Sequence, residues 1–259
     1  MPPSLRCRHY RSHEPMAVGS VAGAVPVVEA AAELEPGDPT DLLTPLFVDL
    51  QISGLGGVDF SNAAEPTPAA VRAVARTLWG QGIGYLLPTV LTGGLDDLRR
   101  NFEVPAESCR DPQLATSIPA FHLEGPHISP DDGPRGAHRL KHVQPPSWAE
   151  FEALQEVAEG RIGLVALAPE QERAIPAIGH TNASTRELGS AVEAGAVLST
   201  HLGNGSHAEI RRHADIELDV FSPESFTILR WGEGRHEVVT TVVAGQVRHP
   251  LSAQDALPS

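Results

Sequence analysis

The sequence FHLEGPHISP, residues 121–130, has the pattern of a buried strand that stops abruptly at a carboxylate. Residues 117–123 are apolar enough for a buried strand, and Gly125 and Pro126 end it, because proline has no N–H to donate. Glu124 therefore lies at the carboxyl end of the strand. In parallel α/β folds this end holds ligands and metals, so Glu124 is a candidate site residue. The alternative is a loop carboxylate that caps the next turn, and this segment alone does not decide between the two.

Strands and helices alternate along the chain around this segment. Residues 46–52 form a near-continuous apolar run, which is typical of a strand buried on both faces. The predicted strands are residues 46–52, 85–92, 117–123, 161–168, 175–179 and 196–200, and the predicted helices are residues 67–79, 95–102, 148–159 and 184–194. Alternation of this kind favours a parallel sheet, so we expect an α/β fold with function at the carboxyl ends of its strands.

Composition excludes several classes of function. The 259 residues include 33 Asp and Glu against 19 Lys and Arg, a formal net charge of -14. This acidity argues against a surface for nucleic acid or anionic membrane, whose affinity comes from clustered cations. The length suits one large domain or one domain with a small appendage. No run approaches about 18 apolar residues, so no membrane span is expected.

Cysteine usage indicates a reducing compartment. The chain has two cysteines, Cys7 and Cys109, which are expected to lie far apart. We interpret both as free thiols and expect a cytoplasmic protein. The start of the chain faintly imitates a signal peptide, but glycines and a proline interrupt its apolar residues 16–28, so no signal peptide is expected.

Three polar side chains directly follow predicted strands: Glu124, His180 and His201. A single histidine beside an apolar strand is more often a core or loop residue that binds a backbone carbonyl. Three such residues at three strand ends would meet at one edge of a parallel sheet, with His180 and His201 on adjacent strands. Two imidazoles and a carboxylate with an open position form a catalytic site for one divalent metal ion, Zn or Fe, which can deprotonate water near neutral pH. The sequence therefore predicts a metal site.

Six short motifs resemble, in their order, the N-acetylglucosamine-6-phosphate deacetylases of the amidohydrolase superfamily. They are FVDLQ (47–51), LPT (87–89), HLEGP (122–126), LAPE (167–170), GHTNA (179–183) and THLGN (200–204). They are specific as a set, although no single one is, and the resemblance covers roughly residues 46–212. It implies a (β/α)8, TIM-barrel-like fold with a small β-sandwich built from both termini, and usually a homodimer. The implied activity is removal of acetate from an amino-sugar phosphate, a small molecule.

The resemblance also implies roles for individual residues. Ligands of the metal fall on Glu124, His180 and His201. Gln51 and Ser53 stand where the superfamily has its first-strand pair of histidines, so a single ion is expected. The substrate contacts implied are Gln51, His138, Asn204, Gly205 and Arg212, of which Arg212 reaches across the dimer in the family.

Elementary chemistry agrees with the implied substrate contacts. His138 and Arg212 could form charge-assisted hydrogen bonds with a phosphate, and Gly205 would let the backbone approach a ligand closely. The alternatives are an exposed loop histidine and a solvated arginine, with Arg211 or Lys141 supplying the cation instead.

The chain departs from this family pattern in its second half. The expected general base is an Asp at a strand end well beyond His201, but only 58 residues follow His201. Asp215 and Asp219 alternate with apolar residues, as outward-facing strand positions do. Four residues, 171–174, separate Glu170 from the next predicted strand, whereas a parallel crossover needs about a dozen or more.

We therefore expect an incomplete barrel of about six βα units. The predicted domains are a poorly ordered segment at 1–40 with at most one strand, the barrel at 41–213, and a β-sandwich remnant and tail at 214–259. Three explanations are open: a shortened, damaged or mis-spliced deacetylase, which we favour; a barrel closed by oligomerisation; or a metal and sugar-phosphate site without fast hydrolysis. Another amidohydrolase with a different amide substrate, and a catalytically inactive binding or scaffold protein, are the competing functions.

Overall fold

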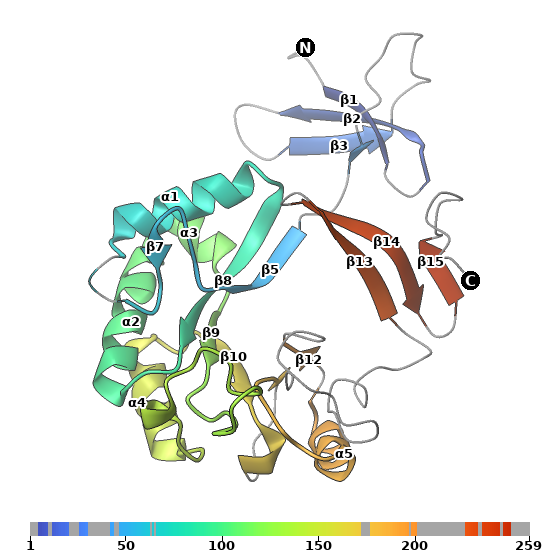
Figure 1. Ribbon diagram of the computed structural model, residues 1–259. Coiled ribbons are helices and arrows are strands. Elements are labelled where there is room, and N and C mark those ends of the chain that lie inside the picture. Colours follow the sequence, from blue (N-terminus) through green and yellow to red (C-terminus); the bar gives the residue numbers. More distant parts are fainter. Residues whose placement is uncertain are drawn as a thin grey trace.

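The computed structural model is shown in Figure 1. It describes residues 5–9, 12–20, 26–30, 42–43, 47–62, 64, 66–171, 177–196, 198–200, 226–232, 235–243 and 246–249.

A parallel sheet of six strands forms the centre of the described chain. Its strands are β5 (Phe47–Ile52), β8 (Ile83–Leu91), β9 (Phe121–Glu124), β10 (Ile162–Leu167), β11 (Ala177–Ile178) and β12 (Leu198–Ser199). They pair in chain order, from β5 at one edge to β12 at the other, and each pairing is parallel. The six predicted strands and the parallel α/β class are thus confirmed.

Helices follow the strands where the periodicity predicted them. Their bounds are α1 (Pro68–Trp79), α2 (Leu95–Ser108), α3 (Pro112–Ser117), α4 (Trp148–Val157) and α5 (Thr185–Glu193). Side chains of Thr67, Ser147 and Ser184 accept hydrogen bonds from backbone N–H groups of the first turns of α1, α4 and α5. Short elements complete the region: β6 (Gly54–Leu55), β7 (Val58–Asp59), and the 3-10 turns η1 (Leu140–His142) and η2 (Pro169–Gln171).

The connection before β9 differs from the prediction. Residue 117 was expected to begin a strand, but Ser117 ends α3, a helix that the apolar pattern did not reveal. Asp111 caps this helix by accepting from the N–H of Gln113, and Pro112 occupies its first turn. Helix α2 also continues to Ser108, beyond the predicted residue 102. The strand is therefore shorter than expected, but it still ends at Glu124.

The main core lies between the sheet and the helices on one side of it. Figure 1 shows α1, α2 and α4 together on this side, with α1 and α2 packed on β8 and α4 packed on α2. Val71, Leu86, Phe102 and Leu123 are fully buried in this cluster. The ring of Phe102 stacks on that of Phe121, with centroids 5.9 Å apart. The core thus holds β8 and β9, whose ends carry the polar residues described below.

Strand β5 is not buried on both faces, as its apolar sequence predicted. Phe47, Val48 and Leu50 are 61%, 54% and 41% exposed. The physical reason is position: within the described residues β5 is an edge strand that pairs with β8 alone. Its composition would suit a strand with neighbours on both sides.

The sheet is open in the described part of the chain, since β5 and β12 form its two edges and do not pair with each other. The connection from β10 to β11, residues 168–176, includes the 3-10 turn η2 in its described part. Closure of a barrel therefore stays a prediction.

Two smaller sheets come from the terminal regions. The first contains β1 (Leu5–His9), β2 (Pro15–Ser20), β3 (Pro26–Ala30) and β4 (Leu42–Leu43), in the order β3-β2-β1-β4. Three strands thus lie in residues 1–40, where the sequence predicted at most one, because antiparallel pairing supplies order that the weak apolar periodicity did not indicate. The second contains β13 (Phe226–Gly232), β14 (Arg235–Val243) and β15 (Gln246–His249), all antiparallel.

The predicted domain limits stay predictions. Across the described stretches, no helix is long and apolar enough to cross a membrane.

Two phenylalanines test this division between core and edge. Replacement of buried Phe102 by alanine should lower the free energy of unfolding by about 3–5 kcal/mol, since it leaves a cavity in the main cluster. The same replacement at exposed Phe47 should cost below about 1 kcal/mol. Urea unfolding of the two variants measures both, and equal losses would contradict the assignment of β5 as an exposed edge.

Candidate metal centre

Glu124 is held at the rim of the sheet by its neighbours on both sides. It is the last residue of β9 and lies in register with Leu91 of β8 and Ala166 of β10. Its side chain is almost fully buried, at 1% exposure. The chain turns away at Gly125, whose φ is +84°, and a Cβ there would lie 2.0 Å from Thr92 Oγ1. The Gly-Pro turn predicted from sequence therefore ends strand β9 at Glu124 and so fixes the position of the carboxylate.

His180 points its Nε2 atom at this carboxylate. It follows β11 by two residues, and its φ of +50° is unusual for a residue other than glycine. Its ring Nδ1 lies 2.9 Å from the carbonyl oxygen of Pro134, which can only accept, so Nδ1 carries a proton and donates it. The other ring nitrogen, Nε2, lies 3.1 Å from Glu124 Oε1.

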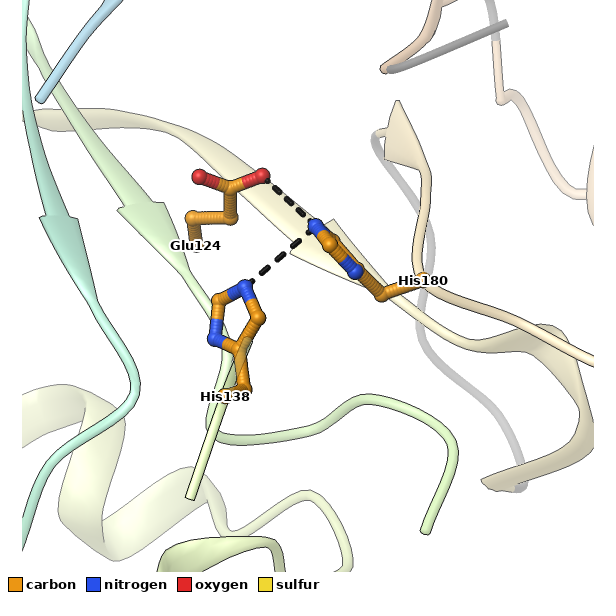
Figure 2. A group of neighbouring side chains, drawn as sticks. All are labelled: Glu124, His138 and His180. Atoms are coloured by element: carbon orange, nitrogen blue, oxygen red, sulfur yellow. Dashed lines mark hydrogen bonds and ion pairs between the residues drawn. The ribbon is translucent and has the colours of Figure 1, made fainter. Parts of the chain in front are cut away.

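His138 approaches the same place from the loop after β9, as Figure 2 shows. Its Nε2 lies 3.3 Å from Nε2 of His180, and its Nδ1 lies 2.8 Å from Thr92 Oγ1. The Thr92 hydroxyl donates its proton to the carbonyl oxygen of Glu124 at 3.4 Å, so it accepts from Nδ1–H of His138. Both histidines therefore direct Nε2 toward the carboxylate. Their rings meet edge to face, 4.3 Å between centroids.

Gln51 stabilises the carboxylate from strand β5. Its Nε2 donates a hydrogen bond to Glu124 Oε1 at 2.7 Å. An amide N–H has no lone pair for a cation, so this geometry makes Gln51 an orienting group for Glu124. Its predicted contact with substrate stays a prediction, as does the role of Ser53.

This donor set suits one divalent cation. Glu124, His138 and His180 each offer a ligand atom, all within 4.8 Å of one another. Ligands held about 2.0–2.2 Å from a tetrahedral ion lie roughly 3.3 Å apart, close to the 3.1 and 3.3 Å measured here. Two imidazole lone pairs at this distance repel each other unless a proton or a cation lies between them. The described residues that could hold an ion are these three.

Known proteins were compared with the chain in sequence and in structure. No protein-family model matches it. The N-acetylglucosamine-6-phosphate deacetylase of Bos taurus is 36% identical over 181 residues, which cover 63% of this chain and 42% of that protein. The N-acetylgalactosamine-6-phosphate deacetylase of Escherichia coli O157:H7 is 28% identical over 202 residues, covering 73% of this chain and 51% of that protein. A solved N-acetyl-D-glucosamine-6-phosphate deacetylase of Mycobacterium smegmatis, in complex with N-acetyl-D-glucosamine-6-phosphate, aligns with a TM-score of 0.65 and 27% identity, over 84% of this chain and 60% of that one.

The chain is similar in sequence and in fold to N-acetylglucosamine-6-phosphate deacetylases. The resemblance inferred from six motifs is thereby confirmed. The chain spans about half the length of the curated deacetylases that it matches.

Several residues to which the deacetylase pattern assigns roles lie outside the described part of the chain. These are His201, Asn204, Gly205 and Arg212, together with Asp215 and Asp219. Thr200, the residue before His201 in the sequence, is described. Its N–H donates to the carbonyl oxygen of Ile178 at 2.8 Å. Strand β12 therefore lies beside β11, as the prediction of adjacent strands for His180 and His201 requires.

A cavity of about 660 Å³ opens beside His138. Polar and charged side chains line it, among them Thr92, Arg100, Asn101 and Arg139. His138 and Thr92 thus face both this cavity and the group around Glu124.

Sequence reasoning missed the groups that orient the two histidines. Thr92 lies one residue after β8, and its place at a strand end in the LPTVLT segment was an available signal. The Pro134 carbonyl had none, because every residue has a carbonyl and only the folded loop decides where it points.

Two histidine variants test the metal centre. His180→Ala should weaken Zn²⁺ binding by more than about 100-fold, because a ligand is lost. The matched control is His127→Ala, since the Nδ1 of His127 likewise lies within hydrogen-bond distance of a backbone carbonyl oxygen, that of Gln144 at 3.2 Å, and His127 is not a member of the group. It should keep the affinity within about threefold. Competition with a chromophoric chelator measures both, and equal affinities would remove His180 from the site.

Proposed function

We propose that this protein holds one divalent metal ion, zinc or iron, and hydrolyses the acetamide of N-acetylglucosamine 6-phosphate to glucosamine 6-phosphate and acetate. The observation that carries the proposal is the approach of His180 Nε2 to Oε1 of Glu124, at 3.1 Å, at the carboxyl end of a parallel sheet, with Nε2 of His138 beside them. Its relatives are deacetylases of N-acetylated hexosamine 6-phosphates.

The residues proposed to hold the ion are Glu124, His180 and His201. When bound, such an ion lowers the pKa of a water ligand and polarises an amide carbonyl. Gln51 keeps Oε1 of Glu124 oriented, and the Pro134 carbonyl keeps the proton of His180 on Nδ1, so that Nε2 is available. These contacts fix the ligand atoms before any ion arrives.

Substrate would be held beside this group. His138 could also reach the ion, but we assign it to the substrate because its ring borders the polar cavity and the deacetylase pattern implies a substrate contact at this residue. Asn204, Gly205 and Arg212 are proposed for the sugar and phosphate, with Arg212 contributed across a homodimer. The general base that moves a proton from water to the leaving amine is not assigned, since no described Asp contacts the group.

For the whole protein we propose a TIM-barrel-like (β/α)8 architecture, incomplete in this chain, with a small sandwich from the two terminal sheets. The chain-order parallel sheet and the TM-score of 0.65 support this. We also propose a cytoplasmic location. The alternative function is binding of metal and sugar phosphate without fast hydrolysis, which the unassigned base favours.

Acetate release tests the hydrolytic function. Protein loaded with Zn²⁺ or Fe²⁺ should release acetate from N-acetylglucosamine 6-phosphate, faster than from the unphosphorylated sugar. N-acetylgalactosamine 6-phosphate serves as the competing substrate. Bound metal without acetate release would establish the alternative, and preference for the galactose epimer would correct the substrate.

His138 can be tested by binding alone. In metal-loaded protein, His138→Ala should weaken binding of N-acetylglucosamine 6-phosphate about 10-fold or more, because a hydrogen bond to a charged or polar ligand is lost. Metal content should stay unchanged. Calorimetry with metal analysis measures both quantities, and loss of the metal would make His138 a ligand of the ion instead.

A further inference from the structure

We infer that Glu170 is a positioning residue that fixes His180 for metal binding, an inference that rests on the proposed metal site. The need for such a residue follows from the fold. Strand β11 has two residues, so its ladder holds the following segment weakly. His180 nevertheless keeps a positive φ, which costs on the order of 1 kcal/mol or more and persists only where surrounding contacts impose it.

The carboxylate of Glu170 supplies those contacts directly after His180. It lies in η2, beyond the end of β10. One oxygen, Oε1, accepts from the backbone N–H of Asn182 at 2.7 Å, and the other, Oε2, accepts from the hydroxyl of Thr181. Thr181 Oγ1 in turn accepts from the N–H of Ala183 at 3.1 Å. Glu170 thus binds two consecutive residues and restrains the backbone that leaves His180.

Contacts from the loop after β9 complete this support. The N–H of Ser129 donates to the carbonyl oxygen of His180 at 2.8 Å. The side-chain amide of Asn182 donates to Asp131 Oδ2 at 2.9 Å. Thr181, which lies between His180 and Asn182 in the sequence, is 4% exposed. His180 is therefore held on one side by the loop that also carries Pro134 and His138, and on the other by Glu170.

A carboxylate is required here for a simple chemical reason. Both groups that approach Glu170 are donors, an N–H and an O–H, and an ionised carboxylate has two oxygens that only accept. An amide of the same shape offers one oxygen for the N–H of Asn182, and its NH₂ group meets Thr181 only if the hydroxyl turns round to accept. Glu170→Gln therefore removes the hydrogen bond that Thr181 donates to a charged oxygen, with almost no change in volume.

Metal affinity is the first measurement. In the full chain, Glu170→Gln should weaken Zn²⁺ binding by about 10- to 100-fold, the range found when groups that orient ligands are removed. The matched control is Glu187→Gln, because Glu187 also accepts from a backbone N–H, that of Ser184, at 2.7 Å, but in the capping box of α5. The control should keep the affinity within about threefold even if it unfolds more easily.

Rescue separates positioning from general damage. Thr181→Val should also weaken Zn²⁺ binding, whereas Thr181→Ser, which keeps the hydroxyl, should restore it. A purely structural role predicts lower stability of the metal-free protein with unchanged Zn²⁺ affinity in Glu170→Gln. That result would overturn the inference.

A metal-free measurement keeps this inference distinguishable from the proposed function. The Nδ1–H of His180 should give a slowly exchanging ring resonance in ¹⁵N spectra of the metal-free protein, because it donates to Pro134. Glu170→Gln should lose this resonance and Glu187→Gln should keep it. Retention in Glu170→Gln refutes positioning by Glu170, whatever the protein hydrolyses. Absence of Zn²⁺ binding or acetate release in the unmodified protein refutes the proposed function instead, and the resonance still decides the role of Glu170.

Discussion

A buried carboxylate at the end of a parallel strand is the constraint around which the other contacts are arranged. Glu124 is 1% exposed, and an ionised carboxylate loses several kcal/mol of hydration when it is buried without partners. Gln51 compensates part of this loss by donating to Oε1 at 2.7 Å, whereas the unprotonated Nε2 of His180, 3.1 Å from the same oxygen, does not. A cation would compensate the remainder and also separate the two imidazole lone pairs. The contacts that stabilise the buried carboxylate of Glu124 therefore involve the same atoms that would bind the metal ion.

The positions of the side chains around Glu124 are fixed by the loops more than by the strands that precede these loops. Strand β9 has four residues and β11 has two. The loop after β9 supplies His138 and the Pro134 carbonyl, and η2 supplies Glu170. Short strands set the register at the rim, and hydrogen bonds between the loops then set the direction of each ring. This division is common in α/β proteins, where the sheet places loops and the loops carry function.

Strand β5 combines a contact to the site with an exposed apolar surface. Gln51 reaches Glu124 from β5, while Phe47 and Val48 of the same strand are mostly exposed. The strand has the composition of an internal strand and the surroundings of an edge. Exposed apolar edges promote association in water, so the open side of the described sheet is also where further chain or another copy would gain most by pairing.

The sequence by itself determined the six strands of the central sheet, four of its helices and their order, because apolar runs and helical spacing are local signals. It also determined that Glu124 and His180 lie at the carboxyl ends of strands, since Gly-Pro and the GHTNA motif mark strand ends. Only the tertiary structure decided that His138 meets His180, that Gln51 turns to Glu124, and that β5 is exposed. These facts depend on contacts between residues 42 to 73 positions apart, for which a local pattern carries no information.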